Sequence, residues 1–128
     1  MAARKLIGLL ALVLVFPVGA LAGYGARVLM HWVSTPSIVE FGDRSALLER
    51  TGSELVLFSV STCAFCGKAR QWLTANAVPF KELVVDESLA AQQLFDELDE
   101  PGVPVLVMRD RVIRGFAMDE YAAALGRN

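Results

Sequence analysis

The hydrophobic pattern begins with a long apolar stretch close to the N-terminus. From Leu6 to Ala26 the sequence contains no charged residue. A helix of that length, rising about 1.5 Å per residue, would cross the roughly 30 Å hydrocarbon core of a bilayer. Arg4 and Lys5 precede the stretch and only Arg27 follows it closely. This bias favours a cytoplasmic N-terminus, with the rest of the chain on the other side of the membrane.

Two other interpretations of this stretch remain open. Ala20-Leu21-Ala22 has the small-x-small pattern of a signal-peptidase site, so the segment could be a cleavable signal peptide. It could also be a buried helix of a soluble domain. We expect residues 1–33 to be a membrane anchor or signal-like segment. As an anchor it makes the protein a single-pass membrane protein, and we expect the domain on the non-cytoplasmic (periplasmic) side.

After the apolar stretch, residues 34–53 have the pattern of a linker with a short helix. Within them, 38–41 could form a short edge strand, and 43–50 predicts a helix that Asp43 can cap and Gly52 ends. The continuous apolar run 55–60 is typical of a central strand covered on both faces.

The remaining periodicities complete a domain over residues 54–128. They predict three helices and three further strands; Phe65, Ala69, Trp72 and Leu73 share one side of the first helix. The expected helices are 66–76, 88–98 and 118–125, and the expected strands are 80–85, 105–108 and 112–113. The order βαβαββα implies an α/β domain with a mixed four-stranded sheet and helices on both faces.

Composition and charge narrow the range of possible functions. The formal net charge is −2 and the pI is about 5.3, so nothing favours a nucleic-acid partner. The only two cysteines are Cys63 and Cys66, and the only histidine, His31, is distant in sequence. These residues cannot complete a four-ligand zinc site within one chain, and we expect no metal site. A single close pair of cysteines suits redox chemistry.

The position of the pair supports that chemistry. Cys63 follows the predicted central strand and lies at the entry to the next helix, where unpaired backbone N–H groups and the helix dipole stabilise a thiolate. Cys66, one turn later, is expected to face inward as the resolving thiol. Lys68 and Arg70 could add positive potential, or could simply be solvated.

The run from Leu57 to Ala69, including Cys63-Ala64-Phe65-Cys66, resembles the strand, active site and first helix of the glutaredoxin family. Gly102-Val103-Pro104 resembles the Thr-Val-Pro element of that family, and Arg114-Gly115-Phe116 resembles its Gly-Gly turn. The resemblance implies a thioredoxin-like fold and thiol–disulfide oxidoreductase activity.

The resemblance also implies roles for individual residues. Cys63, Cys66 and a cis Pro104 would be catalytic, with Pro104 beside the sulfurs. A second set would bind substrate, including a backbone contact to glutathione. This set comprises Val103, Phe65, Arg114, Gly115 and Asp119.

Position 60 departs from the family pattern and changes the expected substrate preference. Val60 stands where the family usually has a lysine that binds a glutathione carboxylate, so we expect weak affinity for glutathione. The partner would be a disulfide-containing protein or a glutathione mixed disulfide, with glutathione as a possible co-substrate and no tightly bound cofactor. An iron–sulfur-cluster-binding module and a non-catalytic membrane-tethered assembly domain are the alternatives.

Overall fold

The structure is a computed structural model, and it describes residues 37–127. The predicted anchor at residues 1–33 therefore lies outside the described residues. Within 37–127, no helix is both long enough and apolar enough to span a membrane.

The secondary structure of the described residues confirms the predicted order of elements. From the expected central strand onward the order is βαβαββα, and one strand and one helix precede it. The bounds are β1 (Val39–Phe41), α2 (Ser45–Thr51), β2 (Val56–Ser59), α3 (Ala64–Ala75), β3 (Lys81–Val84), α4 (Leu89–Leu98), β4 (Val105–Val107), β5 (Arg111–Arg114) and α5 (Met118–Ala124).

The sheet is mixed, as predicted, but the expected number of four strands is wrong. Its order is β1-β5-β4-β2-β3, in which β2 and β3 are parallel and the other neighbouring pairs antiparallel. The fifth strand, β1, comes from the segment expected as a linker. It is a short edge strand that pairs with β5, and the Arg114 N–H also donates to the carbonyl of Ile38, the residue before β1, at 2.7 Å.

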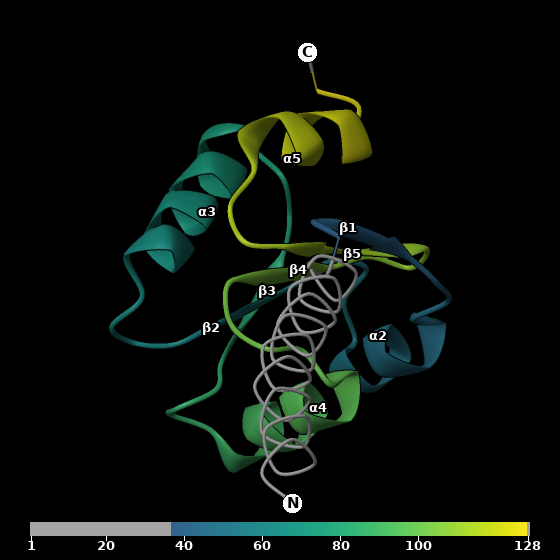
Figure 1. Cartoon of the computed structure of the whole chain (residues 1–128), viewed down its shortest axis with the longest axis vertical. Helices are drawn as coiled ribbons and strands as arrows, with labels where there is room; N and C mark the ends of the chain where they lie inside the picture. The colour runs from purple at the N-terminus through teal and green to yellow at the C-terminus, as the bar shows by residue number, and fades with distance from the viewer. Residues whose placement is uncertain (1–36, 128) are drawn as a thin grey trace, which may run out of the picture. The chain divides into compact units, whose positions relative to one another are not determined.

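The sheet is covered on both faces, which explains the continuous apolar run in β2. Leu57 points into a cluster with residues of α3 and α5, whereas Val56 and Phe58 point into a second cluster with residues of α2 and α4. Figure 1 shows α3 and α5 on one side of the sheet and α2 and α4 on the other. All four β2 residues are buried. Because both faces are apolar, burial keeps this strand inside the sheet, between β4 and β3.

Local signals set several helix ends. Gly52 adopts a left-handed φ of 69° at the end of α2, and the Ser88 side chain caps α4 by accepting from the Ala91 N–H. Asp43 lies one residue further out than expected. Its carboxylate accepts from the Ser45 N–H at 2.9 Å, but the residue at the N-cap position itself is Arg44.

Candidate active site

The two cysteines meet at the first turn of α3. Cys63 is the N-cap residue of this helix, with extended backbone angles, and its Sγ accepts a hydrogen bond from the Cys66 backbone N–H at 3.1 Å. A disulfide joins the two residues, whose Cα atoms are 5.2 Å apart. Cys63 is half-buried and Cys66 is fully buried. The predicted placement at a helix entry and the inward position of Cys66 are confirmed.

The loop before Cys63 is fixed by Asp86. The Ser61 N–H donates to the Asp86 carboxylate at 2.9 Å, and the Ser61 hydroxyl donates to the same group. These bonds hold the pKa of the Asp86 carboxyl below its usual value, because both favour the ionised carboxylate. Because Asp86 follows β3 and Ser61 follows β2, the two parallel strands anchor the approach to the active site from the same edge.

A second tether fixes α3 to the sheet. The Arg70 Nε donates to Glu82 on β3 at 2.7 Å, and the buried Ser59 hydroxyl donates to the other oxygen of Glu82 at 2.7 Å. The arginine lowers the pKa of the Glu82 carboxyl, with a smaller contribution from Ser59. Since Glu82 pairs with Arg70, this arginine helps to hold α3 in place and adds little positive potential at Cys63.

Phe65 does not share the side of α3 that holds Ala69 and Leu73, contrary to our expectation. Its side chain is 59% exposed, and the helix face that packs on the sheet runs through Cys66, Ala69 and Leu73. Phe65 is in the first turn of the helix. The Lys68 Nζ lies 5.0 Å from the centroid of its ring. An exposed aromatic ring therefore stands between the two cysteines in sequence, covered in part by a lysine.

The turn that contains Val103 and Pro104 lies at the same end of the sheet as Cys63. The Val103–Pro104 peptide bond is cis, as the resemblance implied. Phe58, near the end of β2, pairs with Val105 at the start of β4, so the chain leaves β2 towards Cys63 where it enters β4 from Pro104. The Gly115 N–H donates to the Pro104 carbonyl at 2.8 Å.

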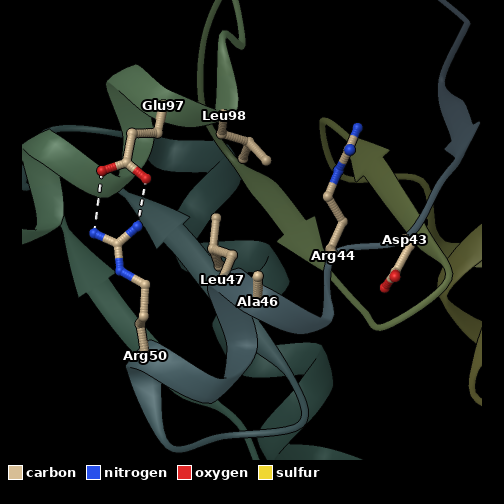
Figure 2. A pocket seen from close by; sticks show the side chains of 7 residues that line it. All are labelled: Asp43, Arg44, Ala46, Leu47, Arg50, Glu97 and Leu98. Carbon is tan, nitrogen blue, oxygen red and sulfur yellow. Dashed lines mark hydrogen bonds and ion pairs between the residues drawn. The ribbon is translucent and has the colours of Figure 1, made fainter.

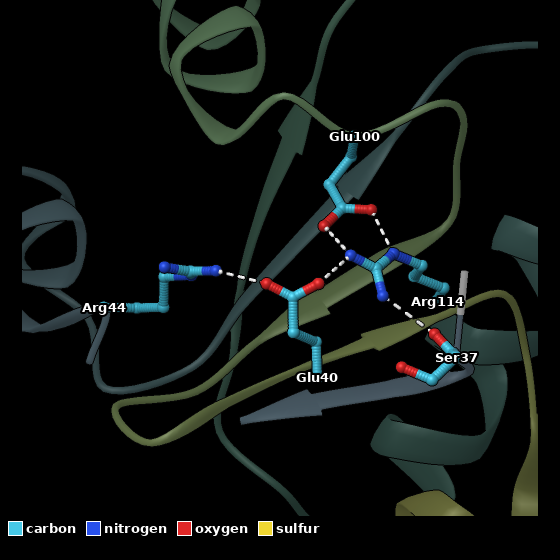
Figure 3. Close-up of polar contacts among 5 residues, drawn as sticks. All are labelled: Ser37, Glu40, Arg44, Glu100 and Arg114. Atoms are coloured by element: carbon cyan, nitrogen blue, oxygen red, sulfur yellow. Dashed lines mark hydrogen bonds and ion pairs between the residues drawn. The ribbon is translucent and has the colours of Figure 1, made fainter. Parts of the chain in front are cut away.

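Arg114, expected to bind substrate, has protein partners on all sides. Its guanidinium makes two bonds to Glu100, from Nε and from Nη2, the latter at 2.8 Å, and a further bond to Glu40. Its Nη1 donates to the Ser37 carbonyl at 2.8 Å. Figure 3 shows these groups converging on Arg114, with Arg44 on the far side of Glu40. Four of its five N–H groups thus donate to protein acceptors, which leaves little donor capacity for a substrate carboxylate.

The last two predicted site residues lie at the start of the closing helix. Gly115 has a left-handed φ of 73°, and its carbonyl accepts from the Tyr121 hydroxyl at 3.3 Å. A left-handed φ suits glycine because a Cβ would be strained there. Asp119 is exposed in the first turn of α5. Neither residue is buried, so a substrate that approaches from solvent could contact both.

Two hollows differ in their relation to this site. An open groove of about 410 Å³ lies beside the active-site loop, lined by Val60, Val85, Asp86, Glu87, Ser88, Leu89 and Gln92. Another, of about 250 Å³, lies between α2 and α4, where Arg50 pairs with Glu97 (Figure 2). The first hollow adjoins the active-site loop through Val60 and Asp86, whereas no residue of that loop lines the second.

Sequence reasoning missed the charged residues that hold the site together. Glu100 and Glu40 pair with Arg114, Asp86 fixes the loop, and Glu82 tethers α3. Only Asp86 carried a signal, because it directly follows a predicted strand and could be expected at the same sheet edge as the cysteines. No group of three or more His, Cys, Asp or Glu side chains within 37–127 is arranged to hold a metal ion.

Most of the domain is similar in sequence to a known protein family. Residues 55–113 match the family model for glutaredoxin. This match supports a relationship of the domain to the glutaredoxin family. No curated protein sequence matches the chain significantly.

Solved glutaredoxin structures resemble the chain in fold. The Archaeoglobus fulgidus glutaredoxin is 20% identical, with a TM-score of 0.55 over 66% of this chain and 98% of its own. The Methanosarcina mazei Go1 glutaredoxin is 28% identical, with a TM-score of 0.52 over 57% and 78%. The dithiolic glutaredoxin of Trypanosoma brucei brucei is 24% identical, with a TM-score of 0.51 over 73% and 93%. The domain has the thioredoxin-like α/β fold, and the glutaredoxin match together with Cys63 and Cys66 suggests thiol–disulfide oxidoreductase activity.

Proposed function

We propose that this glutaredoxin-like domain is a dithiol thiol–disulfide oxidoreductase, with Cys63 as nucleophile and Cys66 as resolving cysteine. The observation that carries the proposal is the hydrogen bond from the Cys66 N–H to Cys63 Sγ at the start of α3. In the reduced protein the same N–H and the helix dipole would stabilise a Cys63 thiolate, and the half-buried position keeps its sulfur within reach of a substrate.

The reaction transfers two electrons in two exchange steps. The Cys63 thiolate attacks one sulfur of the substrate disulfide, which forms a mixed disulfide and releases the other sulfur as a thiolate that takes up a proton. Cys66 then loses its proton and attacks Cys63 Sγ, which releases the second substrate thiol. The substrate is reduced and the domain is left with the Cys63–Cys66 disulfide, which a thiol such as glutathione or a partner dithiol must reduce.

The substrate in this proposal is a protein disulfide or a glutathione mixed disulfide. The backbone of Val103, next to the cis Pro104, would pair with the chain that carries the substrate cysteine. The exposed Phe65 ring would contact apolar parts of that chain, and Gly115 and Asp119 would border the opposite side of the substrate.

We also propose that the domain acts outside the cytoplasm, tethered through the apolar segment Leu6–Ala26.

Substitution of each cysteine in turn tests the proposal. Cys63→Ser should abolish reduction of a model disulfide such as insulin. Cys66→Ser should accumulate mixed disulfides on Cys63 and should still reduce glutathionylated peptides, because that reaction needs only the nucleophile. Equal, full activity in both single variants would exclude a nucleophile at Cys63.

The same preparations separate the two alternative functions. An iron–sulfur module would show visible absorbance from a bound cluster and would lose it in Cys63→Ser. A non-catalytic assembly domain would give no turnover in the wild-type protein with any disulfide or reductant tested. We expect turnover without visible absorbance.

A further inference from the structure

The turn from Glu100 to Pro104 is held at both of its ends by the same short stretch of β5. At one end, the Arg114 side chain makes its paired bonds to Glu100. At the other end, the Arg114 backbone pairs with Val105, and the adjacent Gly115 N–H donates to the Pro104 carbonyl. Val103 lies between these fixed points, so its backbone position depends on both of them.

The ion pair between Arg114 and Glu100 is largely buried. The Glu100 side chain is 2% exposed and the Arg114 side chain 17% exposed. Removing one partner of a buried ion pair leaves an uncompensated charge, which is strongly destabilising. Glu100 therefore favours a turn conformation that keeps it against Arg114, and the two glutamates raise the pKa of the arginine.

The first residues of the domain complete the arrangement. Glu40 on β1 lies between Arg114 and Arg44, and the Ser37 carbonyl accepts from Arg114 (Figure 3). The charges alternate from Arg44 through Glu40 and Arg114 to Glu100, so each carboxylate of the set faces a guanidinium. The short strand β1 thereby contacts, through one arginine, the turn that carries Val103.

We propose that Arg114 and Glu100 are positioning residues that fix the Val103–Pro104 turn for substrate binding, with Glu40 of β1 as their support. This inference rests on the proposed function, since it assigns the turn to substrate. Arg114 then serves the site through protein carboxylates instead of through a carboxylate of the substrate.

The proposal predicts which kinetic quantity changes. The reactivity of Cys63 depends on the N-terminus of α3, whereas the fit of a substrate chain depends on the Val103 turn. Arg114→Met should therefore raise KM for a disulfide substrate about 5-fold to 30-fold and change kcat little. The pH profile of Cys63 alkylation by iodoacetamide should stay where it is. Arg114→Lys should restore part of the loss, since an ammonium retains the charge but not the paired geometry.

Arg111→Met is the matched control. Arg111 is the first residue of β5, as Arg114 is the last, and it pairs with the exposed Asp110 on the surface. Its loss should leave KM unchanged. Where Arg114→Met does not fold, the double variant Arg114→Met/Glu100→Gln removes the unpaired buried charge and should raise KM in the same way.

Hydrogen exchange separates this inference from the proposed function. The Gly115 amide, which donates to Pro104, should exchange faster in Arg114→Met than in wild type, while amides in the middle of α3 keep their protection. If the wild-type protein has no turnover but Gly115 exchanges faster in the variant, the proposed function fails and the structural role of Arg114 stands. Wild-type KM together with wild-type exchange at Gly115 in a folded variant would overturn the inference.

Discussion

A lysine at position 60 tests whether this site is limited in its use of glutathione. Val60 lies three residues before Cys63 and lines the open groove beside the active-site loop. The charged residues that line the groove are Asp86 and Glu87, both acidic. A substrate carboxylate in the groove thus meets two like charges and no compensating cation. Val60→Lys would supply that cation.

The size of the expected gain follows from the openness of the groove. A hydrogen bond to a charged group contributes about 1.5–3 kcal/mol where it is desolvated, and an exposed ion pair about 0.2–1 kcal/mol. Val60 is half-buried, and the exposed Glu87 would compete for the new ammonium. We therefore expect about 1–1.4 kcal/mol, which lowers KM for a glutathionylated peptide by about 5-fold to 10-fold.

Steady-state kinetics with two substrates measures the effect. The control variant is Val60→Met, which adds length without charge. Val60→Lys should lower KM for the glutathionylated peptide but not for a plain protein disulfide, and the gain should shrink in high salt. An equal improvement in Val60→Met, or none in Val60→Lys, would refute the reasoning. In the second case, glutathione carboxylates already find a partner in the wild-type protein.

The remaining predictions concern stability and location. Glu82→Gln should lower the free energy of unfolding at pH 7 by about 0.5–1.5 kcal/mol, because it removes the charge that pairs with the half-exposed Arg70. The folded-state pKa of Glu82 is below the usual 4.5, so its contribution is present above that pH and is lost as the pH falls through the folded pKa. Urea unfolding at pH 7 and pH 3 should show the difference between the two proteins closing at the lower pH, and a constant difference would contradict it. Alkaline carbonate extraction should leave the full-length protein in the membrane pellet through Leu6–Ala26, and recovery of the intact chain in the supernatant would exclude an anchor.

The order of elements could be predicted because it depends on local periodicity and burial. The apolar run at 55–60 predicted a strand covered on both faces, and Val56 and Leu57 indeed point into different clusters. Strand β1 was harder to assign to the sheet, since three residues are too few to establish a period and the strand is stabilised by pairing with β5. That partner is distant in sequence, so the fifth strand became clear only in the folded sheet.

The cysteine pair could be predicted for the same reason, and the surroundings of Arg114 could not. The Cys63 cap is formed by a residue three positions away, within the motif itself. Arg114 pairs with Glu100 and Glu40, which are separated from it by 14 and 74 positions. Family resemblance placed a substrate-binding residue at 114, but long-range ion pairs decide where its guanidinium lies.

The site has two halves, the cysteine pair at the start of α3 and the turn that carries Val103. Different interactions build these halves, so they should respond to mutation separately. In the proposed function, the N-terminus of α3 would stabilise the Cys63 thiolate, and the Arg70–Glu82 tether holds this helix against the sheet. The Val103 turn, which the proposal assigns to substrate, is held by tertiary ion pairs and one backbone hydrogen bond. A change in the first half should move the pH profile of alkylation, and a change in the second should move KM.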